Sequence, residues 1–216
     1  MAAGLAALAI APRPATAQSF LDRLNLDRLQ ISSLGASFGR IRPSQVVPTN
    51  LYGLSADYGE IERDWRVVFG ATYWESRFRD NVVQGFVDSL QKSLSDTAAR
   101  VVASPIKLYD VTFSLEGRYT PSRSGDLRPF IGVGIAAHVI NAEGKLIKGT
   151  FVERSLDDIA AGLFVDGGAT LRVLPRFGIE GSARGDLLSG FRSVQLRASA
   201  LYYFGGLHTT PTERSP

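Results

Sequence analysis

The chain contains no cysteine among its 216 residues, and only two of those residues are histidines. Without thiols it can form neither disulfide bonds nor thiolate metal sites. No run of eighteen apolar residues follows the N-terminal region, so no transmembrane helix is predicted. The formal net charge is only +3 and comes from scattered residues, which argues against a nucleic-acid-binding protein. The length is sufficient for one domain with a well-buried interior.

What the sequence does contain is alternation, and residues 106–119 show it most clearly. From Tyr109 to Tyr119, apolar or neutral residues occupy every second position, and polar or charged residues stand between them. This period of two predicts a β-strand with one apolar face and one polar face. The two tyrosines stand at opposite ends of the apolar face. That order is typical of a strand that crosses a bilayer, with a phenol group at each interface.

Eight alternating segments follow one another along the chain. They cover residues 29–41, 51–60, 65–78, 106–119, 128–140, 159–174, 177–185 and 193–204. The connections after the second, fourth and sixth segments are short, whereas 79–105 and 141–158 are long, and 42–50 and 186–192 are intermediate. Short turns on the periplasmic side and long loops outside are typical of outer-membrane proteins. The sequence therefore predicts an all-β fold, an eight-stranded antiparallel up-and-down transmembrane β-barrel with short periplasmic turns and longer extracellular loops.

The connection 79–105 has a pattern of its own. Apolar residues recur there at helical spacing, and they are Val83, Phe86, Val87, Leu90 and Leu94. This spacing predicts an amphipathic helix over about 81–96. Two placements are open: the helix lies on the barrel rim or the membrane surface, or it packs on its own loop.

The two ends of the chain lie outside the alternating region. Residues 2–11 are apolar, and Ala15-Thr16-Ala17 forms an A-x-A pattern typical of a signal-peptide cleavage site. The predicted organisation is a cleaved signal peptide at 1–17, a periplasmic lead-in at 18–28, the barrel at 29–204 and a disordered periplasmic tail at 205–216. Export places the protein in the envelope of a Gram-negative bacterium, and the barrel places it in the bacterial outer membrane.

The polar faces of the predicted strands carry ten charged residues, five acidic and five basic, and every base is an arginine. They are Asp57, Asp110, Glu116, Asp166, Glu180, Arg66, Arg118, Arg172, Arg184 and Arg197. Arginine forks onto carboxylates in confined places, and eight strands leave an interior that side chains can fill. We therefore expect these residues to form a charge network that plugs the barrel interior.

A soluble, lipocalin-like carrier would also have eight alternating strands. Its outer face would carry several lysines, but Lys92, Lys107, Lys145 and Lys148 all fall in long loops or at a loop-side strand end. The aromatic residues also favour the membrane barrel, because they fall into two interface belts. Tyr58, Trp65, Tyr119, Phe177, Tyr202 and Phe204 lie on the short-turn side, and Tyr52, Tyr73 and Tyr109 lie on the loop side.

Two stretches resemble a known family. The stretch Arg128-Pro129-Phe130-Ile131-Gly132-Val133-Gly134 is similar to the R-P-Y-x-G-x-G stretch of the eight-stranded outer-membrane β-barrels, the OmpA transmembrane-domain and OmpX type, and the closing strand ends in Tyr202-Tyr203-Phe204. The resemblance covers about 29–204. It implies that the barrel-assembly machinery recognises the closing strand.

The sequence shows no catalytic constellation. His138 lies on an inward face without the His-x-Ser pattern of lipid-A deacylase barrels, and we expect it to be an interior hydrogen-bonded residue. No metal site and no cofactor are predicted. Lys145, Lys148 and Arg154 either contact lipopolysaccharide phosphates or are simply solvated.

These observations together predict a non-enzymatic outer-membrane barrel with a charge-plugged interior and surface-exposed interaction loops. The partners expected for it are outer-membrane lipid and lipopolysaccharide, but no nucleic acid. The alternatives are a small passive channel for small or hydrophobic solutes and a soluble lipocalin-like carrier.

Overall fold

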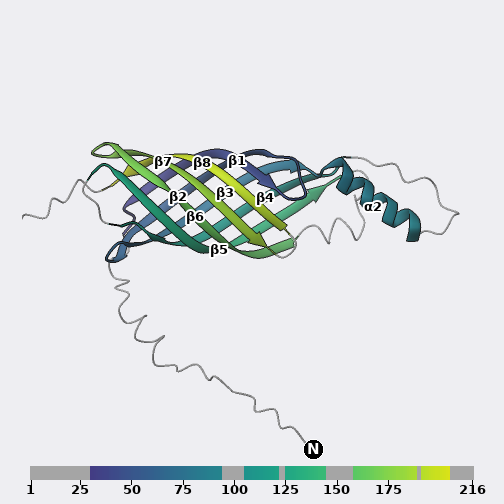
Figure 1. Cartoon of the computed structure of the whole chain (residues 1–216), viewed down its shortest axis with the longest axis horizontal. Helices are drawn as coiled ribbons and strands as arrows, with labels where there is room; N and C mark the ends of the chain where they lie inside the picture. The colour runs from purple at the N-terminus through teal and green to yellow at the C-terminus, as the bar shows by residue number, and fades with distance from the viewer. Residues whose placement is uncertain (1–29, 94–104, 122–124, 145–157, 189–190, 205–216) are drawn as a thin grey trace, which may run out of the picture.

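The computed structural model describes residues 30–93, 105–121, 125–144, 158–188 and 191–204. Its strands are β1 (Ser33–Pro43), β2 (Thr49–Glu62), β3 (Trp65–Arg77), β4 (Lys107–Tyr119), β5 (Leu127–Glu143), β6 (Asp158–Leu174), β7 (Phe177–Leu188) and β8 (Phe191–Tyr203). Each strand pairs antiparallel with the next along the chain, and β1 also pairs with β8 (Figure 1). The predicted eight-stranded up-and-down barrel is thus confirmed.

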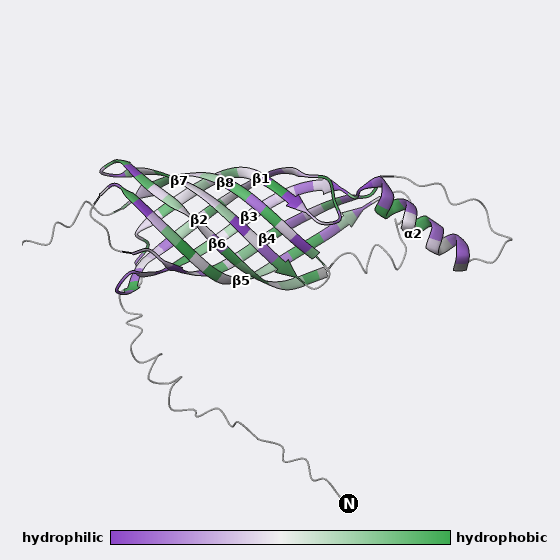
Figure 2. Cartoon of the chain, viewed as in Figure 1, coloured by the Kyte–Doolittle hydropathy of each residue, from purple (hydrophilic) through white to green (hydrophobic). Residues whose placement is uncertain are grey.

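The alternation decides which residues face outward. Phe113 on β4 is 43% exposed on the outer surface, whereas the next residue, Ser114, is 8% exposed and faces the interior. In the register, Phe113 lies between Ala71 of β3 and Ala137 of β5, which share its outer face. Hydrophobic and hydrophilic residues accordingly alternate along the strands (Figure 2). Burial of one face and exposure of the other is what a period of two requires.

The barrel has two unlike ends. The connections β2–β3, β4–β5 and β6–β7 share the short-turn end with the start of β1 and the end of β8. At this end β2 is irregular: its register with β3 shifts between Asp57 and Glu60. Gly59 has φ +85° there, which favours glycine, and its amide donates to Asp57 Oδ1 at 2.7 Å. The bulge bends β2 at the opening of the barrel.

The helix α2 (Asp80–Ser93) stands at the opposite, long-loop end, directly after β3. It confirms the predicted helix for residues 81–93, and residues 94–96 lie outside the described residues. The helix extends beyond the end of the barrel (Figure 1) and does not lie along the rim. Near its start, Val83 is buried with residues of the barrel end. Within the described residues, no helix combines the length and the apolar content needed to cross a bilayer.

Strands β7 and β8 extend into a stretch that the sequence predicts to be a connection. The sequence predicts a connection at 186–192, but β7 continues to Leu188 and β8 begins at Phe191, so only two residues separate the strands. Asp186 explains the extension, because its carboxylate accepts hydrogen bonds from Ser193 Oγ at 3.0 Å and Gln195 Nε2 at 2.7 Å. These bonds hold the loop-side ends of β7 and β8 together.

Candidate functional site

The barrel interior is the candidate site, because it gathers most of the polar side chains that the strands turn away from the surface. Three levels follow one another from the short-turn end to the long-loop end. We name them the mouth cavity, the charged belt and the apolar cap.

The charged belt is centred on Arg118 of β4. Its Nε lies 2.7 Å from Glu116 Oε1, and its Nη1 lies 2.8 Å from Glu180 Oε2 on β7, across the barrel interior. The guanidinium also lies 3.9 Å above the centre of the Phe130 ring. One arginine therefore bridges two carboxylates and stacks on an aromatic ring, a geometry that suits its planar fork.

The charged belt contains two further ion pairs, one between β8 and β6 and one within β7. Arg197 pairs with Asp166, and Arg184 Nη2 lies 2.7 Å from Asp186 Oδ1. Asp186 is missing from the predicted network, because it lies one residue beyond the predicted strand 177–185. Its signal was nevertheless present, since Glu180, Ser182, Arg184 and Asp186 continue the same polar face.

Two inward-facing phenylalanines, Phe130 and Phe164, each pack against a glycine of the neighbouring strand. Phe164 of β6 lies opposite Gly134 of β5, and a Cβ added at Gly134 would meet its ring at 2.5 Å. Arg184 covers this ring from the other side, 3.5 Å from its centre. Phe130 likewise lies opposite Gly168, and a Cβ added at Gly168 would meet its ring at 2.9 Å. Glycine gives the inward rings room, which is the physical reason for several glycines on these strands.

Asp110 does not pair with an arginine as the predicted network implied. Its Oδ2 lies 2.8 Å from His138 Nδ1, and its Oδ1 accepts a hydrogen bond from Thr112 Oγ1 at 3.1 Å. The register explains this, because Thr112 of β4 lies directly opposite His138 of β5. His138 is buried and hydrogen-bonded, as expected.

This cluster does not have the geometry of a catalytic relay. Thr112 Oγ1 lies 3.0 Å from His138 Nδ1, the same ring nitrogen that contacts Asp110. A triad would require the hydroxyl at the other nitrogen, and His138 Nε2 has no hydrogen-bond partner among the described residues. The described residues also contain no group of three His, Asp or Glu side chains placed to hold a metal ion.

The apolar cap closes the long-loop end of the interior. It consists of Ile41, Val46, Leu51, Trp74, Val83, Ile106, Leu108 and Ala142, with Phe78, Ile140 and Phe191 packed against it. Trp74 is 2% exposed, and its ring stacks on that of Phe191 with 6.2 Å between centroids. The cap was not predictable from the alternation. Five of its residues each stand singly at the loop-side end of a polar strand face, and Val46, Val83 and Ile106 lie outside the strands.

The mouth cavity opens at the short-turn end and has a volume of about 520 Å³. Asp57 and Arg66 form an ion pair of 2.8 Å on its wall. Arg172, a member of the predicted network, forms no ion pair among the described residues, and its guanidinium lies 4.2 Å above the Tyr203 ring. Arg128, which the network did not include, also lines the cavity.

The predicted interface aromatics lie on the outer surface near both ends, with one exception. At the short-turn end, Trp65 contacts Tyr119, and Tyr202 contacts both Phe177 and Phe204. The exception is Tyr58, which borders the mouth cavity beside the β2 bulge. Phe204 is exposed at the end of β8 and also borders the cavity.

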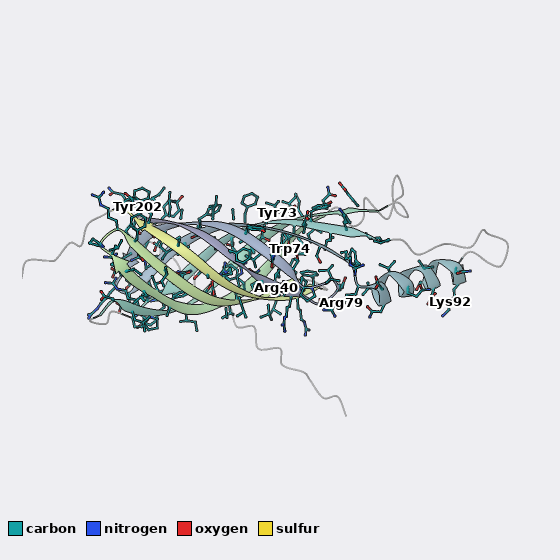
Figure 3. All side chains as sticks on the ribbon, turned by 90° about the horizontal axis from the view of Figure 1, so that it is seen from above. Arg40, Tyr73, Trp74, Arg79, Lys92 and Tyr202 are labelled. Atoms are coloured by element: carbon teal, nitrogen blue, oxygen red, sulfur yellow. The ribbon has the colours of Figure 1, made fainter. Side chains whose placement is uncertain are left out.

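Towards the long-loop end, Tyr52 lies opposite Tyr73 and contacts Phe38. Tyr109, on the outward-facing side of β4, is half-buried. Figure 3 shows Tyr202 near one end of the barrel and Tyr73 towards the other.

Comparisons of the sequence alone are negative: no protein-family model and no curated protein matches the chain. Solved structures do match. Neisserial surface protein A (NspA) aligns with a TM-score of 0.52 at 16% identity, over 80% of this chain and 96% of NspA. The outer membrane protein OprG from Pseudomonas aeruginosa aligns with a TM-score of 0.52 at 8% identity, over 82% of this chain and 98% of OprG. The protein thus has the fold of the eight-stranded outer-membrane β-barrels, the group that its sequence resembles.

Proposed function

We propose that the protein is a non-enzymatic β-barrel of the bacterial outer membrane with a closed interior. The observation that carries the location is the outer face of the strands. Leu54, Ile135 and Leu163 are each about 60% exposed or more, at 67%, 59% and 64%. A contiguous apolar surface of this kind needs a hydrocarbon environment, and a closed barrel leaves no unpaired strand edge within it. The same observation argues against the soluble carrier.

Closure of the interior supports a role other than transport. Arg118 spans the interior to Glu180 at the charged belt, and Trp74 fills the apolar cap above it. Two successive obstructions of different chemistry within the described residues support a closed interior. In this proposal the surface-exposed loops and α2 carry the interaction with partners, and the barrel holds them at the cell surface.

Outer-membrane lipid and lipopolysaccharide are the partners we propose for the outer face. Arg40 and Arg42 of β1 and Arg192 of β8 are exposed at the long-loop end, and none forms an ion pair within the described part of the chain. Arg40 follows Phe38 by two positions on the same face, so it lies just beyond the aromatic belt. Lipid phosphates at that depth are the natural counter-ions for such a group. Lys145, Lys148 and Arg154 lie outside the described residues.

The closing strand supports a second proposed partner, the barrel-assembly machinery. β8 ends in Tyr203, and Phe204 donates its amide to Ser32 O at 3.0 Å. The aromatic terminus thus stands at the seam where β8 meets β1, which is the last pairing that closure of the barrel requires.

One observation favours the runner-up, a small passive channel. Within the described residues, Asp166 Oδ1, Ser182 Oγ, Gln195 Oε1 and Arg197 Nε are buried without a hydrogen-bond partner. Buried polar atoms normally bond to protein or to water, so this mixture of donors and acceptors indicates a hydrated pocket within the belt. Hydration of this kind is the first requirement of a channel.

The location is tested by cell fractionation and by electrophoresis of unboiled samples. The expected result is sedimentation with outer membranes and faster migration without boiling, because a barrel stays compact in detergent. Recovery in the soluble fraction would contradict the proposal.

Closure is tested separately, by single-molecule conductance in planar bilayers. We expect no stepwise current from the wild-type protein. Discrete steps that persist after purification of heat-modifiable protein would favour the channel.

A further inference from the structure

Two arginines at the mouth cavity lie outside the ion pairs of the interior. Arg118 contacts two carboxylates, and Asp110 contacts His138. Arg66, Arg184 and Arg197 each have one carboxylate partner. No ion pair within the described ranges includes Arg128 or Arg172. The lining of the cavity therefore includes two guanidinium groups that no carboxylate of the described residues contacts.

The two arginines lie next to each other on the wall of the cavity. Arg128 of β5 lies opposite Thr170 of β6 in the register, and Arg172 follows Thr170 by two positions on the same inward face. Diagonal neighbours of this kind are within reach of long side chains. Both residues and Thr170 line the cavity. The Thr170 hydroxyl donates to Glu180 Oε2 at 3.1 Å, so the two guanidinium groups are the donors that this wall offers to an anion.

Arg172 is held in place by packing and not by a carboxylate. Its guanidinium lies 4.2 Å from the centre of the Tyr203 ring. The ring in turn lies over Gly178, where an added Cβ would come within 3.0 Å of the Tyr203 hydroxyl. Stacking fixes the plane of the guanidinium but satisfies none of its N–H donors, which remain available to a ligand.

The remaining lining suits an organic body. Ile31, Leu201 and Phe204 contribute apolar surface, and Ser33 and Thr120 contribute hydroxyls. A volume of about 520 Å³ is within the range of small-molecule sites, which are roughly 300–1,000 Å³. The cavity thus combines an anion-binding side with an apolar side.

We propose that the mouth cavity binds a small organic anion, with a carboxylate or phosphate group on Arg128 and Arg172 and a compact apolar body against Ile31 and Leu201. Arginine is suited to both groups because its donors match their oxygen pairs. Asp126 also borders the cavity but pairs with neither arginine within the described residues. The site depends on the closed barrel alone and not on the proposed location or loops.

The full chain in nanodiscs of phosphatidylcholine, titrated with 4-fluorobenzoate and followed by ¹⁹F NMR, tests this site. We expect saturable binding that 4-fluorobenzamide, the neutral analogue, does not reproduce. The double variant Arg128→Gln/Arg172→Gln should weaken binding at least about tenfold, because charge-assisted bonds are the stronger class. Arg172→Lys should weaken it less, since the charge remains. Arg176→Gln is the matched control, because Arg176 lies in the β6–β7 turn and does not line the cavity.

The proposal fails if 4-fluorobenzoate gives the same signal with empty nanodiscs, if the benzamide binds equally, or if the double variant binds like the wild type. Heat-modifiability of every variant shows that a loss of binding is not a loss of folding. A further arm adds phosphatidylglycerol to the nanodiscs. Competition with 4-fluorobenzoate assigns the anion to a lipid headgroup, and no competition assigns it to a soluble anion; either result supports the site.

Discussion

Trp74 of β3 and Phe191 of β8 stack in the barrel interior with their ring planes only 8° apart. The two residues come from strands that are not neighbours in the sheet, so the contact crosses the interior. Their neighbours Tyr73 and Arg192 face the other way, onto the outer surface. The stack is therefore the centre of the apolar cap, and it makes the long-loop end of this barrel a small hydrophobic core.

Trp74→Ala should remove the centre of this cap. We expect the free energy of unfolding to fall by about 3–5 kcal/mol, as for other buried aromatic side chains. Urea unfolding in lipid vesicles measures the change. Tyr73→Ala is the control, because Tyr73 is adjacent but 40% exposed on the outer face. A loss for Tyr73→Ala as large as that for Trp74→Ala would contradict the cap.

Phe113→Arg and Ser114→Arg test the two faces of β4. Phe113 faces outward and Ser114 faces the interior. An arginine on the lipid face near the bilayer midplane should cost about 2–4 kcal/mol. The same change at Ser114 should be milder, because Ser114 lies between the small residues Gly70 and Ala136. Unfolding in vesicles compares the two variants, and equal tolerance would show that the face assignment is wrong.

Gly134→Ala should destabilise the barrel by about 1–3 kcal/mol, the usual cost of overpacking. The added Cβ would lie 2.5 Å from the Phe164 ring and closer still to the backbone carbonyl oxygen of Leu115, so only part of the collision can be relieved at Phe164. Gly181→Ala is the matched control, since nothing lies within 4 Å of a Cβ there. Phe164→Leu should recover part of the loss in a Gly134→Ala background. Additive effects of the two substitutions would argue against direct contact.

Arg118→Met should cost about 3–5 kcal/mol, because it leaves two buried carboxylates without their partner. Glu116 and Glu180 both contact this arginine at less than 3 Å, at 2.7 and 2.8 Å. Adding Glu116→Gln and Glu180→Gln removes the uncompensated charge, so the triple variant should be more stable than Arg118→Met alone. Urea titrations of the three proteins decide the matter. A triple variant no more stable than the single variant would mean that packing on Phe130, and not charge, is what Arg118 provides.

The strands and their faces were predictable from the chain because alternation is a local property. Each strand shows it within its own 11 to 17 residues, and neither register nor partner is needed to recognise it. The predicted strand ends were less accurate where the outward-facing side chains are small. In β7, Gly181, Ala183 and Gly185 form a weak outer face, and the alternation was lost before Asp186.

The partners of the charged residues were not predictable in the same way. Asp110, Arg118 and Arg172 all belong to the same class of inward charged residue in the sequence. In the barrel one contacts a histidine, one contacts two glutamates and one stacks on a tyrosine. Their partners stand on other strands, and strand register, which no single segment contains, decides which side chains meet.

The sequence by itself determined that this protein has eight two-faced strands, an apolar exterior and a charged interior, because each follows from residue spacing along one segment. The apolar cap at one end of the interior, and the cavity with two arginines outside any described ion pair at the other, became visible only in the folded barrel. Both arise from side chains on several strands that closure of the barrel brings to the same level, and closure is a property of the whole sheet.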